Sequence, residues 1–243
     1  MNFKSFVYSS FIKLKEKSFG ECLKYLFFNN NSDTLYIIFN GFQEGNVRLY
    51  NYVRALQKSK ADRLYILDVW GYKGSYYLFE NGSDTPCKNT LALLNHILQK
   101  GHYKHIYSIG SSKGGTAAIY FGLIINASVI IAGACQYNIG NYLTKPEHYE
   151  IFRAMMGVNA GNEEREKLNS IMPSHLQKYK DKSSPIIHLL YSKNEHTYQD
   201  DIIDLLDKLN ECGYRVLEKQ YDFSEHNDIG IYFKKYLREL LLK

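Results

Sequence analysis

The segment with the clearest chemical potential is residues 110–115, which read Gly-Ser-Ser-Lys-Gly-Gly. Ser112 lies at its centre, with Gly110 and Gly114 two residues away on either side. A G-x-S-x-G pattern between a strand and a helix is typical of a sharp turn that lifts a nucleophilic serine above a sheet. The alternative is a glycine-rich turn that happens to contain serine. A phosphate-binding P-loop is excluded, because no Gly-Lys-Ser or Gly-Lys-Thr closes the segment.

The elements around this segment have the order that the turn requires. The apolar run 105–109 predicts a strand before Ser112, and the small-residue pattern 116–121 predicts a helix after it. Along the whole chain, strands and helices alternate, with near-continuous apolar strands. This alternation predicts an α/β fold with a mostly parallel sheet and helices on both faces. Further strands are expected at 22–28 (an edge strand), 34–39, 63–69, 127–132, 185–191 and 216–221, and helices at 47–58, 90–100, 198–212 and 229–242.

Residues 138–182 break this rhythm. They are richer in charge than the segments on either side and contain Pro146 and Pro173. We interpret them as a small helical lid inserted into a single domain that spans residues 1–243.

A serine hydroxyl at neutral pH needs a base. In α/β-hydrolases the nucleophile, the acid and the histidine follow one another in that order, and the histidine comes after the last strand. Of the eight histidines, His226 is the one that follows the strand predicted at 216–221. His188 lies inside an apolar strand and is expected to be a core residue, while His148 and His175 fall in the predicted lid.

The acid should follow the strand predicted at 185–191. The loop 192–198 contains one carboxylate, Glu195, which we assign to orient the imidazole and to stabilise its cationic form. Asp200 and Asp201 are the alternative acids, although their position indicates the first turn of a helix.

An oxyanion hole requires two backbone N–H groups. Lys113, directly after Ser112, should supply one, and Phe42 in the loop after the strand 34–39 should supply the other, with Gly41 permitting close approach of the backbone. The side chain of Lys113 either places a cation beside the site or faces solvent.

Four segments together resemble a known family. They are residues 110–115, 74–78 (Gly-Ser-Tyr-Tyr-Leu), 192–198 (Ser-Lys-Asn-Glu-His-Thr-Tyr) and 225–230 (Glu-His-Asn-Asp-Ile-Gly). The chain resembles the α/β-hydrolase family, in particular the carbohydrate O-acetyltransferase domain of the accessory Sec system and related capsular polysaccharide biosynthesis proteins. The resemblance covers most of the chain. It implies the α/β-hydrolase fold, a Ser–Glu–His triad on Ser112, Glu195 and His226, and acyl transfer to or from a carbohydrate.

Composition narrows the possible partners and location. The formal net charge of +5 is too small to indicate nucleic-acid binding. No apolar run is long enough for an integral membrane segment or a signal peptide, so a cytoplasmic protein is expected. The four cysteines form no C-x-x-C motif, which favours free thiols in a reducing compartment; they are Cys22, Cys87, Cys135 and Cys212.

These patterns lead to a first hypothesis, a serine esterase or O-acyltransferase that acts on a small-molecule or carbohydrate acyl ester, with acetyl as the favoured group. It needs no cofactor and no metal, and it can associate peripherally with glycan assembly proteins. The alternative is a non-catalytic binding or scaffold subunit in glycan or capsule assembly or in glycoprotein export. A thioesterase or peptidase on the same fold is a third hypothesis.

Overall fold

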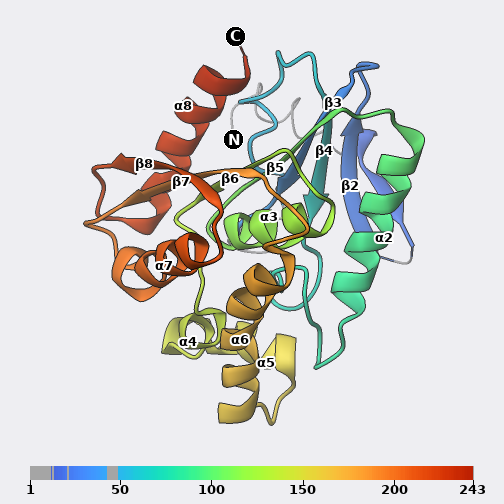
Figure 1. The fold of residues 1–243 in the computed structure, drawn as a ribbon. Helices are drawn as coiled ribbons and strands as arrows, with labels where there is room; N and C mark the ends of the chain where they lie inside the picture. The colour runs from blue at the N-terminus through green and yellow to red at the C-terminus, as the bar shows by residue number, and fades with distance from the viewer. Residues whose placement is uncertain (1–11, 13, 21, 43–48, 243) are drawn as a thin grey trace, which may run out of the picture.

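A computed structural model describes residues 12, 14–20, 22–42 and 49–242 of the 243-residue chain (Figure 1). Its described part contains one sheet with the strand order β1-β2-β4-β3-β5-β6-β7-β8. β2 runs antiparallel to β1 and β4, and the other neighbouring strands are parallel. This confirms the predicted mostly parallel sheet. The strands are β1 Lys17–Phe19, β2 Leu23–Phe28, β3 Thr34–Phe39, β4 Asp62–Leu67, β5 His105–Ser111, β6 Val129–Gly133, β7 Ile186–Ser192 and β8 Arg215–Tyr221.

Two hydrophobic cores lie on opposite faces of this sheet. Along β3, Leu35, Ile37 and Phe39 belong to one core, while Tyr36 and Ile38 belong to the other. The first core is covered by α2 (Thr85–Lys100), α3 (Lys113–Ile124) and α7 (Ile203–Glu211), and the second by α8 (Ile229–Leu241) with the segment 49–61. Helices therefore cover both faces, as predicted.

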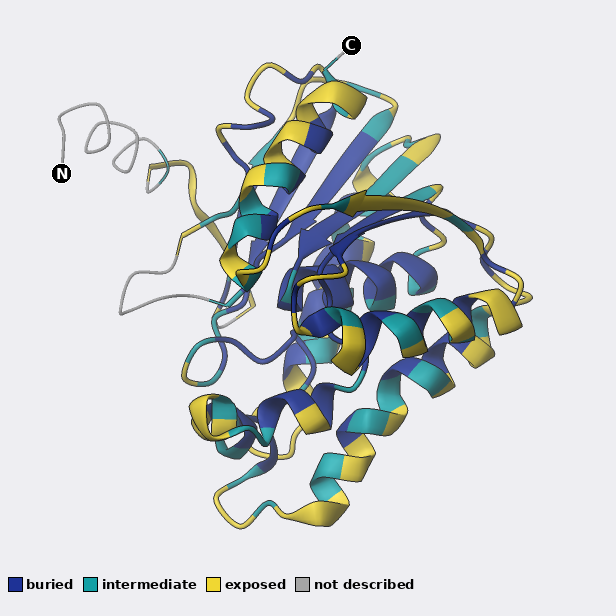
Figure 2. Cartoon of the chain, turned by 90° about the vertical axis from the view of Figure 1, so that its left-hand side faces the viewer, coloured by how far each residue is buried: buried dark blue, intermediate teal, exposed yellow. Residues whose placement is uncertain are grey.

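Helix α3, which follows Ser112, is buried along almost its whole length (Figure 2). Small residues allow this, because a Cβ on Gly115 would lie 2.9 Å from the Cβ of Cys135, and a Cβ on Gly122 would lie 2.9 Å from Ile130. The helix can therefore lie close against β5 and β6. Its position fixes the N-terminal turn, where Ser112 lies.

The structure differs from the sequence prediction at the edge of the sheet. The predicted strand 22–28 is present as β2, but it is not an edge strand, because β1 pairs with its outer side. Three residues, Lys17–Phe19, are too short a strand for a periodic pattern to reveal.

The helix predicted at 47–58 is wrong over the residues that the structure describes. Residues 47 and 48 lie outside the described part, and residues 51–58 form consecutive turns rather than a helix. Tyr52 has φ +61°, a left-handed conformation that a regular helix does not allow. Its ring packs 5.0 Å from Phe233 and its hydroxyl bonds to Ser111, so contacts with distant segments override the local apolar pattern.

Residues 138–182 are helical and connect β6 to β7, and we call them the insertion. They contain α4 (Ile139–Leu143), the 3-10 turn η1 (Pro146–His148), α5 (Tyr149–Met156) and α6 (Asn162–Tyr179). Figure 1 shows these helices together at the end of the molecule away from α8. α6 packs against both α4 and α3, so the insertion rests on the helix that begins at the Ser112 turn.

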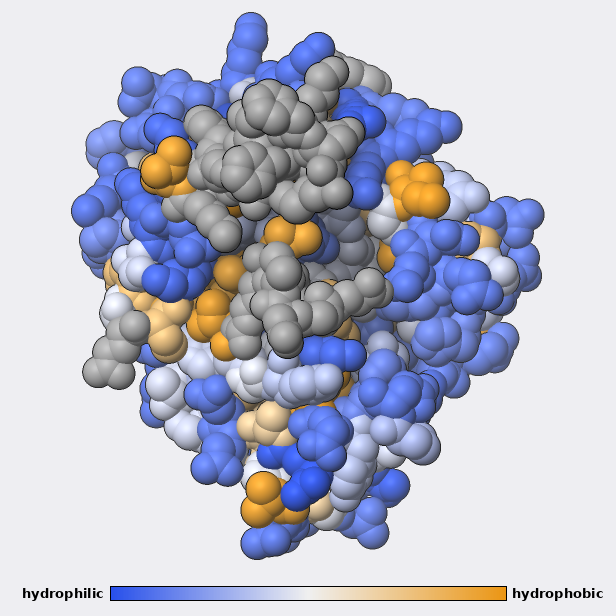
Figure 3. Space-filling model, turned by 180° about the vertical axis from the view of Figure 1, so that it is seen from behind, coloured by the Kyte–Doolittle hydropathy of each residue, from blue (hydrophilic) through white to orange (hydrophobic). Residues whose placement is uncertain are grey.

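The described surface is mainly polar on the face seen in Figure 3, where apolar side chains occur in small groups. None of the helices in the described part of the chain combines the length and the apolar character that a bilayer crossing requires. The four cysteines are free thiols, as predicted.

Candidate active site

The turn between β5 and α3 has the geometry that a nucleophilic serine requires. Ser112 has φ +53° and ψ −133°, a strained conformation for a residue with a side chain. Its backbone N–H donates to the carbonyl oxygen of Gly133 on the neighbouring strand at 2.7 Å. The strained residue is thus held by the sheet, which leaves its hydroxyl free to project into the pocket.

Steric contacts explain why glycine is needed on either side of Ser112. A Cβ on Gly110 would lie 2.0 Å from the carbonyl oxygen of Gly114, and a Cβ on Gly114 would lie 2.5 Å from the carbonyl oxygen of Phe39. Both distances are far below van der Waals contact with backbone atoms. The G-x-S-x-G pattern is therefore required by the close approach of β5, α3 and β3.

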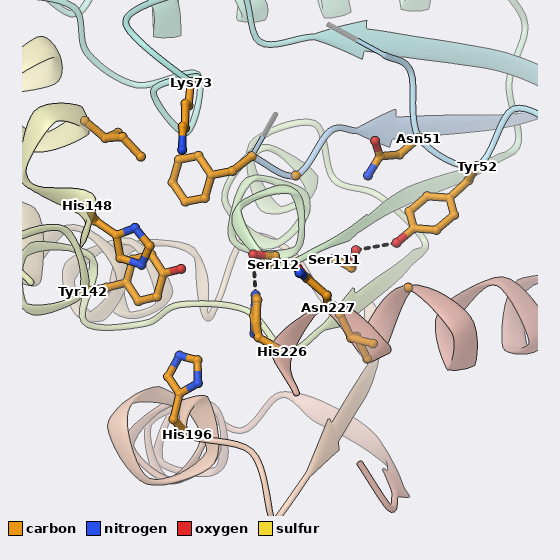
Figure 4. A pocket seen from close by; sticks show the side chains of 15 residues that line it. Asn51, Tyr52, Lys73, Ser111, Ser112, Tyr142, His148, His196, His226 and Asn227 are labelled. Carbon is orange, nitrogen blue, oxygen red and sulfur yellow. Dashed lines mark hydrogen bonds between the residues drawn. The ribbon is translucent and has the colours of Figure 1, made fainter. Parts of the chain in front are cut away.

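Three side chains from distant parts of the sequence form a continuous hydrogen-bonded path, of which Figure 4 shows the bond between Ser112 and His226. Nε2 of His226 lies 2.8 Å from Oγ of Ser112, and Nδ1 of His226 lies 3.0 Å from Oε1 of Glu195. His226 begins the short 3-10 helix η3 (His226–Asp228) after β8, and Glu195 lies in the loop after β7. The structure thus brings together the three residues that the sequence order singles out.

Glu195 is held as a buried carboxylate. Its side chain has no exposed surface. Burial alone would raise the pKa of Glu195, but hydrogen bonds from His226 and Thr197, with the neighbouring imidazoles, outweigh burial and lower the pKa below its usual value. Because a carboxylate can only accept, Nδ1 of His226 carries a proton, and Nε2 of the neutral ring is left to accept from Ser112.

Sequence reasoning missed His196. Its Nδ1 lies 2.8 Å from Oε1 of Glu195, the same oxygen that His226 contacts, and its ring lines the pocket of Ser112. Its only signal in the sequence is its position directly after Glu195. Adjacency in sequence does not by itself predict that two side chains contact each other.

The two alternative acids lie elsewhere. Asp201 is buried and accepts from the backbone N–H groups of Tyr137 and Asn138, while Asp200 pairs with Lys145 at 2.7 Å. Both carboxylates therefore bind residues in or next to the insertion, and neither takes the position beside His226 that an orienting acid would occupy.

The alternative that the Lys113 side chain faces solvent is wrong, while its ammonium group lies 5.6 Å from the ring centroid of Phe42, which lines the pocket. Its ammonium group lies 2.5 Å from Oδ2 of Asp68, and neither side chain has any exposed surface. Lys113 is also absent from the described residues that line the pocket. Its backbone remains at the position expected of an oxyanion donor, the first residue of α3.

Asp68 organises the segment 74–78. Besides Lys113, it accepts from the backbone N–H groups of Ser75 at 2.7 Å and Tyr77 at 3.1 Å. Gly74 is required here because it has φ +113° and a Cβ on it would lie 2.8 Å from Nζ of Lys113. The segment therefore packs directly onto the ion pair behind the turn that holds Ser112.

Tyr77 extends this network to the loop that contains Gly41 and Phe42. Its hydroxyl accepts from the backbone N–H of Asn40 at 2.7 Å and donates to the carbonyl oxygen of Ile66 at 2.8 Å. Gly41 and Phe42 follow Asn40 and line the same pocket as Ser112. The position of this loop is thus set by a buried hydrogen bond. A Cβ on Gly41 would lie 3.6 Å from the carbonyl oxygen of Ser111, the nearest atom among the described residues, which is an ordinary van der Waals contact.

The pocket beside Ser112 has a volume of about 390 Å³. The insertion contributes Tyr142, His148 and Ile151 to its wall. Phe42 stacks with Tyr142 at 6.3 Å, and Tyr142 with His148 at 4.3 Å. The other described lining residues are Gly41, Asn51, Tyr52, Lys73, Ser111, His196, His226, Asn227, Ile229 and Gly230.

Two further histidines are structural. His188 is buried, as expected of a core residue, and its Nδ1 lies 2.5 Å from the hydroxyl of Tyr236. His175 of α6 stacks on Tyr120 of α3 at 3.9 Å and hydrogen bonds to its carbonyl oxygen.

One group in the described part of the chain could hold a metal ion, namely Glu195, His196 and His226, whose ligand atoms lie within 4.8 Å of one another. An ion there would compete with the hydrogen bond between His226 and Glu195. The same side chains thus fit either a proton-transfer path or a metal site, and the prediction that none is needed stays a prediction.

No family model and no curated protein matches the sequence. Solved structures do match its fold. The capsule O-acetyltransferase of Neisseria meningitidis serogroup A superposes with a TM-score of 0.79 at 20% identity, over 94% of each chain. A mutant of that protein in complex with CoA gives a TM-score of 0.76 at 19% identity, over 93% of this chain and 94% of the other.

Two further structures extend the comparison. The Glycosylation Associate Protein (Gap123) complex from Streptococcus agalactiae has a TM-score of 0.71 at 20% identity, over 93% of this chain and 46% of the other. The Staphylococcus aureus fluorophosphonate-binding serine hydrolase FphF has a TM-score of 0.58 at 15% identity, over 90% of this chain and 91% of the other. The chain therefore has the α/β-hydrolase fold and resembles these proteins, as the sequence predicted.

Proposed function

We propose that this chain is a serine-dependent O-acyltransferase or esterase that acts on an acyl ester of a carbohydrate, with acetyl as the transferred group. The observation that carries the proposal is the unbroken hydrogen-bonded path from Glu195 through His226 to Ser112. The path ends at a strained serine between β5 and α3, where α/β-hydrolases hold their nucleophile.

In the first half of the reaction, Oγ of Ser112 attacks the acyl carbonyl carbon while its proton passes to Nε2 of His226. Glu195 stabilises the imidazolium that results. The carbon–oxygen bond to the leaving group then breaks, and His226 returns the proton to the departing atom. The acyl group remains as an ester on Ser112.

In the second half, water or a sugar hydroxyl gives its proton to Nε2 of His226 and attacks the acyl-enzyme. Collapse of the second tetrahedral intermediate releases a carboxylic acid or a new ester, and His226 returns the proton to Ser112. Hydrolysis and transfer thus share every protein group and differ only in the acceptor.

The backbone N–H groups of Lys113 and Phe42 are proposed to bind the oxyanion, with Gly41 beside them. Support comes from the position of Lys113 at the start of α3 and from Gly41 and Phe42 in the pocket wall. Donors held by the fold need no reorganisation when charge develops, which is why such groups contribute strongly to catalysis. The insertion is proposed to act as a lid, because three of its side chains line the pocket.

Acetyl-CoA is the first acyl donor to test, because one capsule O-acetyltransferase structure holds CoA. Such a donor fits the cytoplasmic location and the association with glycan assembly proteins that we propose for the chain. Release of the free thiol with and without a sugar acceptor separates transfer from hydrolysis.

The proposal is tested first with a fluorescent fluorophosphonate, which labels activated serines covalently. We expect the wild type and Ser170→Ala, an exposed serine on α6, to be labelled. Ser112→Ala and His226→Ala should not be labelled, because one lacks the nucleophile and the other the base. A folded wild type that resists the probe would contradict the proposal.

A further inference from the structure

The titratable side chains that the structure describes in the pocket wall are dominated by potential cations. Among the described lining residues, Lys73, His148, His196 and His226 can carry positive charge, and none is an aspartate or glutamate. Glu195 lies behind this wall with no exposed side-chain surface. The described part of the pocket wall therefore presents positive and neutral groups to whatever enters it.

Lys73 is the group whose charge is least compensated. His196 contacts Glu195 at 2.8 Å, and the nearby Lys145 contacts Asp200 at 2.7 Å. Lys73, in contrast, makes no ion pair with any carboxylate of the described chain. Its ammonium nitrogen lies 5.4 Å from the centroid of the Tyr72 ring. Figure 4 shows its side chain entering the pocket with the nitrogen pointing inward.

The behaviour of His148 indicates that these cations share one region. Burial lowers the pKa of His148, and Lys145, Lys73 and His196 lower it further, against the opposing effect of Glu147. Lys145, Lys73 and His196 therefore lie close enough to act on the same imidazole, although burial is the main cause of its lowered pKa.

We propose that the pocket of Ser112 binds a substrate that carries a phosphate or carboxylate group, with Lys73 as the cation that anchors it. This inference rests on the proposed acyl transfer and names the chemical class of its substrate. A lysine ammonium is a compact charge on a flexible stem with three donors, so it can follow a phosphate or carboxylate without a fixed geometry.

The aromatic side chains of the pocket wall indicate which kind of molecule carries the anionic group. Phe42 and Tyr142 are nearly parallel, with 5° between their planes, and His148 lies at 20° to Tyr142. Aromatic side chains of this kind can contact a sugar or a base. The anionic group can thus belong to the carbohydrate or to the phosphates of a thioester donor.

Two matched pairs of substrates separate these sources. Acetylated glucose 1-phosphate is compared with an acetylated methyl glucoside, and S-acetyl-4′-phosphopantetheine with S-acetyl-pantetheine, which lacks the phosphate. In at least one pair we expect kcat/KM to be about tenfold or more higher for the charged member, the effect of one charge-assisted hydrogen bond. The pair that shows the preference identifies the source, and the preference should weaken as salt is added.

Variants of Lys73 test the anchor. In Lys73→Met the ratio of the two kcat/KM values should fall about tenfold, and Lys73→Arg should restore most of it because the charge is kept. Lys180→Met, at an exposed lysine after α6, is the matched control and should keep the wild-type ratio. No preference for the charged member in either pair, or an unchanged ratio in Lys73→Met, would overturn the inference.

Ligand binding measured with the Ser112→Ala variant tests the anion site separately from the proposed reaction. Calorimetry with glucose 1-phosphate and with CoA should show binding to Ser112→Ala that weakens about tenfold when Lys73→Met is added. If such binding is found but no acyl ester is cleaved, the anion site stands and the proposed reaction is wrong. If esters are cleaved but neither probe binds, the reaction stands and the anion site is wrong.

Discussion

The ammonium group of Lys113 and the carboxylate of Asp68 form an ion pair 2.5 Å long in which neither side chain reaches solvent. The pair joins the first residue of α3, next to Ser112, to the end of β4. The turn that holds Ser112 is thus stabilised by a buried ion pair as well as by its backbone geometry.

Breaking this pair should destabilise the protein strongly. We expect Lys113→Met and Asp68→Asn each to lower the free energy of unfolding by about 3–5 kcal/mol, because each leaves a buried group without its partner. In a double-mutant cycle measured by urea unfolding, the double variant should lose much less than the sum of the two. Additive losses would show that the two side chains do not depend on one another.

Glu195→Gln should separate catalysis from folding. The amide is nearly isosteric, but it removes the negative charge that fixes the tautomer of His226 and stabilises its cation. We expect kcat to fall by about 10³–10⁴-fold with a small change in KM, as for carboxylates in this role. The measurement is p-nitrophenyl acetate hydrolysis, with thermal unfolding as the check on folding; activity near the wild-type value would exclude Glu195 from the path.

Gly114→Ala should disturb the turn itself. The added methyl group would meet the carbonyl oxygen of Phe39 at 2.5 Å, so β3, α3 or both must shift. We expect a loss of about 3 kcal/mol or more in stability, together with loss of fluorophosphonate labelling. Gly161→Ala, where nothing lies within 4 Å, is the control and should change stability by about 0.5 kcal/mol or less.

Gly41→Ala answers a different question, because its methyl group finds ordinary contacts in the fold. We expect this variant to unfold at the wild-type temperature. If the reacting acyl group needs the space above residue 41, kcat/KM for p-nitrophenyl acetate will fall; unchanged kinetics would show that the space is not used.

His175 should make stability depend on pH. Burial lowers its pKa to about 4, from an ordinary value near 6.5. Between these values the unfolded chain binds more protons than the folded one. The contribution to stability is therefore complete above about pH 6.5 and is lost, by about 3 kcal/mol in all, as the pH falls toward 4.

His175→Phe can keep the stacking on Tyr120 but cannot titrate. Urea unfolding of this variant between about pH 7 and pH 4 should give a flatter curve than the wild type. His102→Phe, at an exposed histidine, should leave the wild-type curve in place. An equally steep curve for His175→Phe would assign the acid sensitivity to other groups.

The sequence predicted the architecture because each buried strand of a parallel sheet is a short apolar run that can be recognised locally. It also predicted which residues would meet, since the order of Ser112, Glu195 and His226 relative to the strands determines which loops share an edge of the sheet. Their catalytic roles remain predictions. What the sequence could not reveal depends on contacts between distant positions, such as Lys113 with Asp68 and Tyr52 with Ser111.

The insertion has a consequence for how proteins of this shape diversify. β6 and β7 pair directly from Val129 with Ile186 to Gly133 with Leu190, so the sheet is continuous without the helices between them. Those helices nevertheless supply Tyr142, His148 and Ile151 to the pocket wall. A change within residues 138–182 can therefore reshape the pocket wall without interrupting the sheet, and it leaves Ser112, His226 and Glu195 on the strands and loops that hold them.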